Sequence, residues 1–302
     1  DGFPEPTPFH IQYGKSTSGS VTFDTAFPDG VTPLVFLMPT IEQTNTNSDG
    51  PASVFLDGTP TTTGFSWSQQ ESPSPASRYV ESVDMTEIHW VAVNAGTHDL
   101  SNGTQLIAGT VELDTALIGS NSQYVNVVLP STQNVVLNQL QTQVNDCWLT
   151  SLSQFNNTGI RLAMDTSEVR SNNSRCQPDN LNNNQIQAET VAYLSLQSGS
   201  GSIVLNSENL NYHFGQAQTF TAGSVQDLSY QCGFTTALEG FTNPPIFVAG
   251  KNSRRGGDGG WLRRCQLTNS LVSMVVDEDT YRDTDRRHIW ENYSFIALEK
   301  EE

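Results

Sequence analysis

The sequence predicts an all-β fold, and three observations support this prediction. First, its polar residues are mostly uncharged, since only 15% of the 302 residues are charged and only three are lysines. Such a composition suits exposed strands better than helices. Second, hydrophobic and polar residues alternate with a period of two at 64–67 and 90–93, as in strands with one buried face. Third, one order of strand-like segments occurs three times, which is typical of repeated units.

The first set of segments opens with a hydrophobic strand between two prolines. A second hydrophobic strand, a Thr-rich strand, an acidic position and a closing strand follow it. In chain order these five are 33–39, 52–56, 61–67, Glu71 and 88–93. We expect each hydrophobic segment to be a strand of one antiparallel sandwich.

Two further sets follow the same order. The second consists of 135–137, 147–152, 156–162, Glu168 and 191–196. The third consists of 245–248, 261–265, 271–275, Glu278 and 293–298. A non-repeated all-β chain would also give hydrophobic runs, so this alternative stays open. We predict three tandem antiparallel β-sandwich units at 1–118, 119–205 and 206–302, joined by Asn-, Ser- and Gly-rich segments at 119–122 and 198–202.

The four cysteines predict two disulfides. None of them forms a Cys-x-x-Cys pair of the kind that binds zinc or catalyses redox chemistry. Pairing within the predicted units gives Cys147 with Cys176 and Cys232 with Cys265, although the sequence allows three connectivities. Unpaired buried thiols are the alternative. Disulfides require an oxidising compartment, so we expect an extracellular or cell-surface protein.

The charge of the chain excludes some classes of partner. The formal net charge is -18, from 32 acidic and 14 basic residues. This disfavours nucleic acid and anionic membranes as partners. Hydrophobic runs such as 34–38 are far too short to cross a membrane. The chain begins at Asp1 without a basic and hydrophobic leader, so we expect a mature form whose signal has been removed.

Several short motifs of the first unit resemble a known family. They are 21–23, 27–28, 33–36, 63–65 and 90–92. This pattern resembles the H-type lectins of snails and related bacterial repeats. Segments 35–40, 61–65 and 95–98 are also similar to repeats in the biogenesis proteins of mannose-sensitive haemagglutinin pili. The resemblance covers most of the first unit, less of the second and least of the third.

The resemblance implies a six-stranded antiparallel sandwich that assembles as a trimer and binds terminal sugars, often N-acetylgalactosamine, near subunit contacts. Three tandem units in one chain would then resemble a covalent pseudo-trimer. The family's closing Trp-x-Ala strand matches 90–92, and its sugar-binding histidine follows the tryptophan where this chain has Val91.

Candidate ligand-binding residues lie in the first unit. Sugars are recognised by aromatic faces against C–H surfaces and by carboxylates and amides that bind hydroxyls. The candidates are Trp90, His89, Glu71 and His98. His89 and Trp90 point to opposite faces of their strand, so only one of the two can face a given site. Trp67 shares a face with Phe65, and we expect it in the core.

An arginine-rich region near the C-terminus allows two interpretations. Seven of the eleven arginines lie between 254 and 287, among acidic residues. They can form a solvated ion-pair network within their own unit. Alternatively, they can bind an acidic surface of a second copy, because residues 1–250 hold 22 acids against five basic residues. The candidates for this self-contact are Arg254, Arg255, Arg263 and Arg264.

The sequence carries no recognised catalytic signature, and its five histidines are far apart. We therefore predict no enzymatic activity, catalytic residue, cofactor or metal site. The predicted function is a secreted or surface-exposed adhesion module with lectin-like binding of a glycan or glycoconjugate. The alternative is a structural subunit of an extracellular filament or pilus-associated assembly, with self-association or pilus components as its partners.

Overall fold

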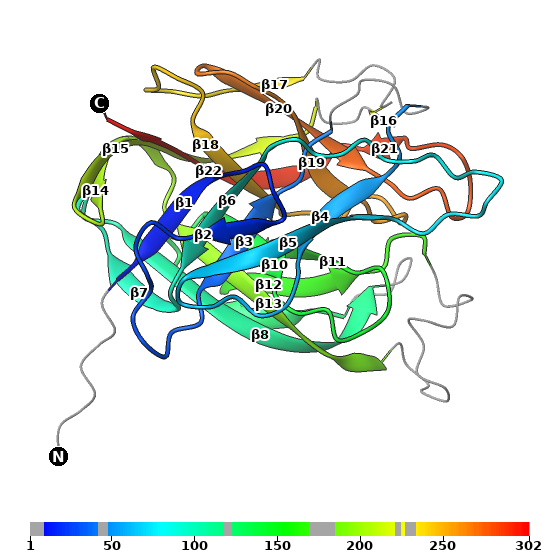
Figure 1. The fold of residues 1–302 in the computed structure, drawn as a ribbon, viewed down its shortest axis with the longest axis horizontal. Coiled ribbons are helices and arrows are strands. Elements are labelled where there is room, and N and C mark those ends of the chain that lie inside the picture. Colours follow the sequence, from blue (N-terminus) through cyan, green and yellow to red (C-terminus); the bar gives the residue numbers. More distant parts are fainter. Residues whose placement is uncertain are drawn as a thin grey trace.

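The structure is a computed structural model that describes residues 9–41, 48–117, 123–169, 185–220, 225–226 and 234–301. These residues form strands, turns and loops and contain no helix. The predicted all-β fold is therefore confirmed (Figure 1). A low charge content and alternating hydrophobicity were sufficient to predict it.

The strands follow one another through the whole described chain. Those before residue 118 are β1 Ile11–Ser16, β2 Ser20–Thr22, β3 Leu34–Met38, β4 Ala52–Leu56, β5 Gly64–Glu71, β6 Ile88–Val93, β7 Gly96–Asp99 and β8 Gln105–Leu117. Those between residues 123 and 205 are β9 Val125–Val128, β10 Val135–Leu140, β11 Thr150–Asn156, β12 Gly159–Asp165, β13 Gln185–Leu196 and β14 Gly199–Leu205. The remainder are β15 Glu208–Gln218, β16 Val225–Gln226, β17 Thr235–Ala237, β18 Ile246–Lys251, β19 Trp261–Leu267, β20 Leu271–Asp277, β21 His288–Ile289 and β22 Asn292–Lys300.

These strands form sheets with almost entirely antiparallel pairing. The sheets are β1-β6-β3, β2-β5-β4, β14-β15-β22-β18, β17-β20-β19, the pair β16-β21, and a seven-stranded sheet. In the seven-stranded sheet, β10-β13-β8 continues to β12, which pairs with β11 and β9. The contact between β8 and β12 is the one parallel strand pair among the described strands, at Ala116 with Met164 and Leu117 with Asp165. The fold is β-sandwich-like, since hydrophobic side chains fill the space between facing sheets.

Strand β3 shows why the hydrophobic runs of this chain do not all alternate. All five of its side chains are buried. Val35 and Leu37 pack into a core between the sheets β1-β6-β3 and β2-β5-β4. Leu34, Phe36 and Met38 point the other way, into a larger core. A strand with a core on each face has no polar side, so it reads as a continuous hydrophobic run.

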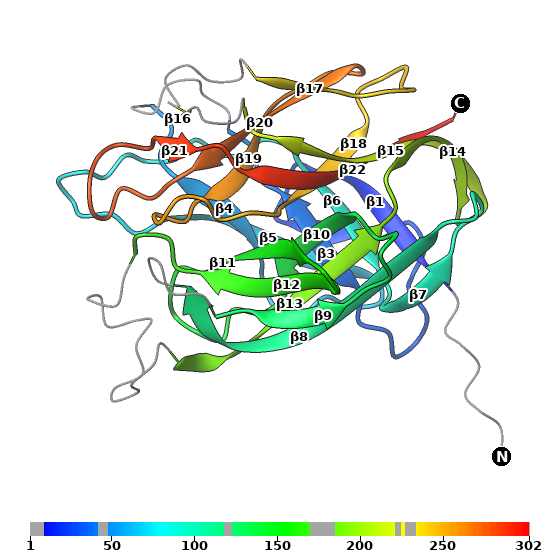
Figure 2. The ribbon, with the colours of Figure 1, turned by 180° about the vertical axis from the view of Figure 1, so that it is seen from behind.

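The larger core joins parts of the chain that are far apart in sequence. It contains residues of β3, β10 and β18, among them Phe36, Leu137 and Phe247. These three strands contact one another, and each lies at the edge of its own sheet. Figures 1 and 2 show the early blue, middle green and late orange strands meeting in this central region. The core is therefore shared by the first, second and last thirds of the chain.

Side chains cover the backbone edges of the central strands. The amide of Gln141, just after β10, accepts a hydrogen bond from the Val35 N–H at 3.0 Å and donates one to the Val35 carbonyl at 2.8 Å. Asn252, just after β18, donates to the Val136 carbonyl of β10 at 3.0 Å. Buried backbone groups need such partners because they are removed from water. Thus the β10 segment covers β3, and the β18 segment covers β10.

The third contact closes this arrangement into a ring. His89 of β6, the neighbour of β3 in its sheet, accepts a hydrogen bond from the Phe247 N–H of β18 at 2.9 Å. Each group of strands therefore covers the next one in cyclic order. A cyclic set of contacts leaves none of the three central edges open to another chain.

Two strands lie in sheets on the far side of the predicted unit boundaries. Strand β8 precedes residue 118 but pairs with β13. Strand β14 precedes residue 205 but pairs with β15. The division into three units stays a prediction; if its boundaries followed the sheets, they would lie before β7 and before β14, because β7 pairs with β8.

The disulfide prediction falls partly outside the described residues, which do not include Cys176 and Cys232. Neither Cys147 nor Cys265 is a free thiol. The pairing of Cys147 with Cys176 and of Cys232 with Cys265 stays a prediction.

Candidate functional site

The structure does not bring the four predicted ligand-binding residues together. His89 is buried, and its Nδ1 accepts the Phe247 N–H. Burial, together with the nearby charges of Arg264 and Lys15, lowers the pKa of His89 to about 2, so the ring is neutral. Because its ring is enclosed by protein, His89 is a structural residue of the central core. The prediction that His89 binds a sugar is corrected, because a ligand cannot reach the buried ring.

Trp90 and His98 are also buried. The Trp90 ring packs against Phe23 and Phe65, with centroid distances of 5.7 and 5.4 Å. His98 of β7 lies 4.6 Å from the Phe9 ring, and its Nε2 is 3.2 Å from the Asn94 carbonyl. Both rings are therefore packed against other parts of the protein, and neither is accessible to a sugar. Of the four candidates, only Glu71 at the end of β5 is partly exposed.

The arginine-rich region contains a fully buried ion network. Arg263 of β19 donates to Asp277 at 2.8 Å and to Asp49 at 3.3 Å. Arg286 binds both oxygens of Asp277, each at 2.7 Å. Burial favours a higher pKa for Asp277, but Arg286 and Arg263 outweigh it and lower that pKa. The network therefore ties β19 and β20 to the loop around residue 49.

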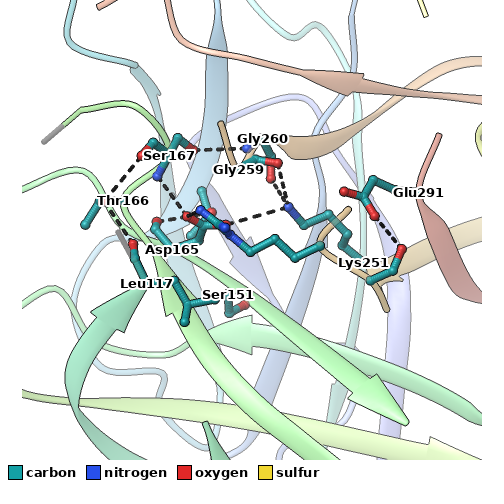
Figure 3. A network of polar contacts seen from close by, with 12 residues as sticks. Leu117, Ser151, Asp165, Thr166, Ser167, Lys251, Gly259, Gly260 and Glu291 are labelled. Atoms are coloured by element: carbon teal, nitrogen blue, oxygen red, sulfur yellow. Dashed lines mark hydrogen bonds and ion pairs between the residues drawn. The ribbon is translucent and has the colours of Figure 1, made fainter. Parts of the chain in front are cut away.

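A second network surrounds Asp165 at the end of β12. The Arg254 Nε donates to Asp165 at 2.7 Å, and the Lys251 Nζ lies 3.9 Å from the same carboxylate. Lys251 also donates to the carbonyls of Gly259 and Gly260. Figure 3 shows Asp165 and Lys251 pointing toward each other, with Ser167 above the carboxylate. Burial lowers the pKa of Lys251, and Asp165 opposes this shift.

These contacts correct the interpretation of the arginines. Arg263 is fully buried, and the side chain of Arg254 is 6% exposed, so neither guanidinium is available to a second chain. The backbone of Arg264 pairs with Pro39 and Ile41. Arg255 is exposed and lies over the Trp290 ring, 3.4 Å from its centroid. Arg254 pairs with Asp165 and Arg263 with Asp49, both from the acid-rich part of the same chain, while the second partner of Arg263, Asp277, lies in the arginine-rich region itself. Both networks are buried rather than solvated.

Strand register reveals a relationship between three carboxylates. Each is the last residue of its strand and pairs with the first residue of the neighbouring strand. The pairs are Glu71 with Ala52, Asp165 with Thr150, and Asp277 with Trp261. The acidic positions chosen from the sequence, Glu168 and Glu278, lie just beyond the last two. The three carboxylates therefore occupy one structural position in three places.

One of these three places is an open cleft. Its volume is about 550 Å³, and its walls include Gln70, Glu71, Gln143, Asn145 and Trp148. Gln70 and Gln143 exchange hydrogen bonds of 3.0 and 3.3 Å across it. Amides and a carboxylate supply both donors and acceptors, so the cleft can bind a polar ligand.

A second hollow, of about 310 Å³, lies between β11 and the strands β15 and β22. Phe155 of β11 is 37% exposed at its rim. Gln216, Gln218 and Asn292 line it beside the buried ring of Tyr293. An exposed aromatic ring next to amides is the combination that sugars require.

Two kinds of feature are absent from the described part of the chain. It holds no group of three or more His, Cys, Asp or Glu side chains arranged to hold a metal ion. Within the same residues, no helix is long and hydrophobic enough to span a bilayer.

Comparisons with protein-family models, with curated proteins and with solved structures found no match. The resemblance to H-type lectins therefore stays a hypothesis.

Sequence reasoning missed several residues of these sites. Asp49 and Asp165 carry no local signal that distinguishes them from other acids, because their partners lie far along the chain. Gln143 and Phe155 lie in polar segments without a motif. One signal was present in the sequence, because an acidic residue lies at or just after the third strand of each predicted repeat. The exact end of each strand would have been needed to choose the acid at that position.

Proposed function

We propose that this chain is a non-enzymatic adhesion module, located outside the cell or at its surface, that binds carbohydrate. Its larger sheets, with the seven-stranded sheet divided between β8 and β12, would form three β-sandwich units around the central core, as a covalent pseudo-trimer. The absence of free thiols at Cys147 and Cys265 supports an oxidising compartment.

The order of strands supports the pseudo-trimer. The sheets β1-β6-β3, β8-β13-β10 and β15-β22-β18 place corresponding strands in the same order. The facing sheets β2-β5-β4, β9-β12-β11 and β17-β20-β19 do the same. The cyclic covering of β3, β10 and β18 is what a ring of three heterologous contacts requires.

The observation that carries the carbohydrate proposal is the exposed Phe155 ring beside an amide-lined hollow. A sugar ring can lie on Phe155 while Gln216, Gln218 and Asn292 bind its hydroxyls. The hollow is uncharged, so a neutral glycan fits it best. It lies where β11 meets β15, which is a contact between two of the proposed units.

A glycan array tests this proposal. The unmodified protein should bind one group of related neutral glycans. Phe155→Ala should lose this binding by about tenfold or more, since stacking and burial of one aromatic ring contribute about 1–3 kcal/mol. Phe234→Ala, which removes another exposed aromatic ring, is the matched control and should bind normally. No array signal, or equal binding by Phe155→Ala, would contradict the proposal.

A filament subunit is the second candidate function. Strand β9 pairs with β12 and is an edge strand of the described structure, and its Val128 is 79% exposed. An exposed hydrophobic edge strand can pair with another chain. Regular fibres in negative-stain images, lost in Val128→Lys, would favour this function. Dispersed particles would favour adhesion.

A further inference from the structure

The three carboxylates at equivalent strand ends have different partners. Asp165 is met by the guanidinium of Arg254, and Asp277 by those of Arg263 and Arg286. Both carboxylates are fully buried. At these two places the chain thus neutralises its own acid with arginine, through short charge-assisted hydrogen bonds.

Glu71 has no such partner. It accepts a hydrogen bond from the Ser82 N–H at 2.6 Å and another from the Tyr79 hydroxyl. Among the described residues, no lysine or arginine forms an ion pair with it. Gln143 follows the end of β10 at the same interval as Arg254 follows the end of β18. Glutamine therefore stands where the corresponding segment supplies a guanidinium.

The space around Glu71 is open rather than filled. The cleft of about 550 Å³ begins at Glu71 and Gln70 and is bounded opposite by Gln143 and Trp148. The hydroxyl of Tyr79 hydrogen-bonds to the carboxylate, but Tyr79 is not among the residues that line the cleft. This place therefore combines a carboxylate, amide groups and free volume.

Trp148 adds an independent observation. It lines the cleft and is 4% exposed, and its indole N–H finds no acceptor among the described residues. A buried donor without an acceptor costs about 1–3 kcal/mol. An oxygen of a bound ligand would supply that acceptor. The ligand would then carry a carbonyl or carboxylate oxygen in addition to its cationic group.

We propose that the cleft at Glu71 binds a guanidinium group, as carried by free arginine or by an arginine side chain of a peptide. The guanidinium takes the place that arginine side chains of this chain take at Asp165 and Asp277. This site lies apart from the Phe155 hollow, and the proposal goes beyond carbohydrate binding. The two proposals can therefore fail independently.

Titration by calorimetry or NMR tests the proposal directly. The probes are free arginine, an acetylated and amidated Gly-Arg-Gly peptide, and the same peptide with citrulline, which has the arginine shape without its charge. Arginine in at least one form should bind, and citrulline should bind about tenfold more weakly or not at all. Binding by free arginine alone would identify a small-molecule site, and binding by the peptide alone a protein partner. Failure of both, or equal binding of citrulline, would overturn the proposal.

Variants assign the binding to Glu71. Glu71→Gln keeps an acceptor for the Ser82 N–H and should weaken arginine binding about tenfold. Glu87→Gln changes another partly exposed carboxylate, which pairs with Lys15, and should leave arginine binding unchanged. Circular dichroism confirms that both variants fold. Equal loss in the two variants, or no loss in Glu71→Gln, would contradict the assignment.

Filling the cleft from within the chain gives a test that needs no external ligand. Gln143→Arg should bring a guanidinium to Glu71, raise the melting temperature and abolish binding of the arginine probes. In a Glu71→Gln background, the same substitution should not raise the melting temperature. An equal effect of Gln143→Arg in both backgrounds would show that Glu71 is not the cation acceptor.

Discussion

Individual aspartates hold several arginine side chains of this protein in buried ion pairs. Asp277 accepts hydrogen bonds from Arg263 and Arg286, and all three side chains are buried. A buried cation that loses its partner retains the full cost of leaving water. At the residue scale, Arg263 and Arg286 are therefore part of the interior.

Replacing Asp277 should consequently be severe. Asp277→Ala leaves two buried guanidinium groups without this carboxylate and should lower the free energy of unfolding by about 3–5 kcal/mol. Urea denaturation followed by tryptophan fluorescence measures this change. The exposed Asp283→Ala is the control and should change stability by less than about 0.5 kcal/mol. A similar small effect for Asp277→Ala would show that the network contributes little.

Glu168 should make stability depend on pH. Burial, followed by repulsion from Asp279, Asp258 and other acids, raises the pKa of Glu168 from 4.5 to about 8. The folded state therefore binds a proton more tightly than the unfolded state, and stability falls as pH rises from about 4.5 to about 8. Glu168→Gln should stabilise the protein at pH 8 more than at pH 5. Urea midpoints at both pH values measure the difference, and equal shifts would contradict the raised pKa.

At the scale of elements, side chains cover the edges of β3, β10 and β18 that have no neighbouring strand in their sheets. The side chain of Gln141 pairs with both the N–H and the carbonyl of Val35, as a neighbouring strand would do. Asn252 donates to one carbonyl of β10, and His89 accepts from one N–H of β18. These contacts give partners to buried backbone groups where three sheets meet edge to edge around one core.

Removing one cover should expose this dependence. Gln141→Leu leaves the Val35 N–H and carbonyl without their side-chain partner, at about 1–3 kcal/mol for each buried group. We expect a loss of at least about 2 kcal/mol in the free energy of unfolding, measured by urea denaturation. The exposed Gln143→Leu is matched in chemistry and should cost less than about 0.5 kcal/mol. Equal costs would mean that the cover of β3 is not important.

At the scale of the whole molecule, the central core makes the chain interdependent. Its residues come from strands between β1 and β22, and its largest side chains include Phe36, Phe247 and Phe295. Separating any third of the chain would expose part of this surface to water.

Unfolding should therefore be a single cooperative transition. Differential scanning calorimetry should give one peak whose calorimetric and van't Hoff enthalpies agree. A separately expressed fragment of residues 1–95 should be unfolded or aggregated, because one face of β3 and β6 would be uncovered. Independent peaks, or a stably folded fragment, would contradict a shared core.

The residues that the sequence suggests as sugar ligands differ from those that lie open in the structure. Trp90 and His89 are of the residue types that bind sugars, yet tertiary packing encloses both. Phe155 lies in a polar segment without a motif, and only the approach of β15 and β22 makes it part of a hollow. Local sequence shows which residues could bind a sugar, but accessibility depends on what packs over them.

The sequence by itself determined the all-β class, because the two-residue period and the hydrophobic runs are local properties. Only the tertiary structure decided that Arg263 and Arg254 are interior, that His89 covers β18, and that Glu71 lies open while its two counterparts are buried. Several of the contacts behind these outcomes join residues far apart in the sequence, as in Arg254 with Asp165 at a separation of 89 residues and His89 with Phe247 at 158. The energy of an ion pair or an edge hydrogen bond depends on burial and distance in space, and neither is encoded in the neighbouring residues.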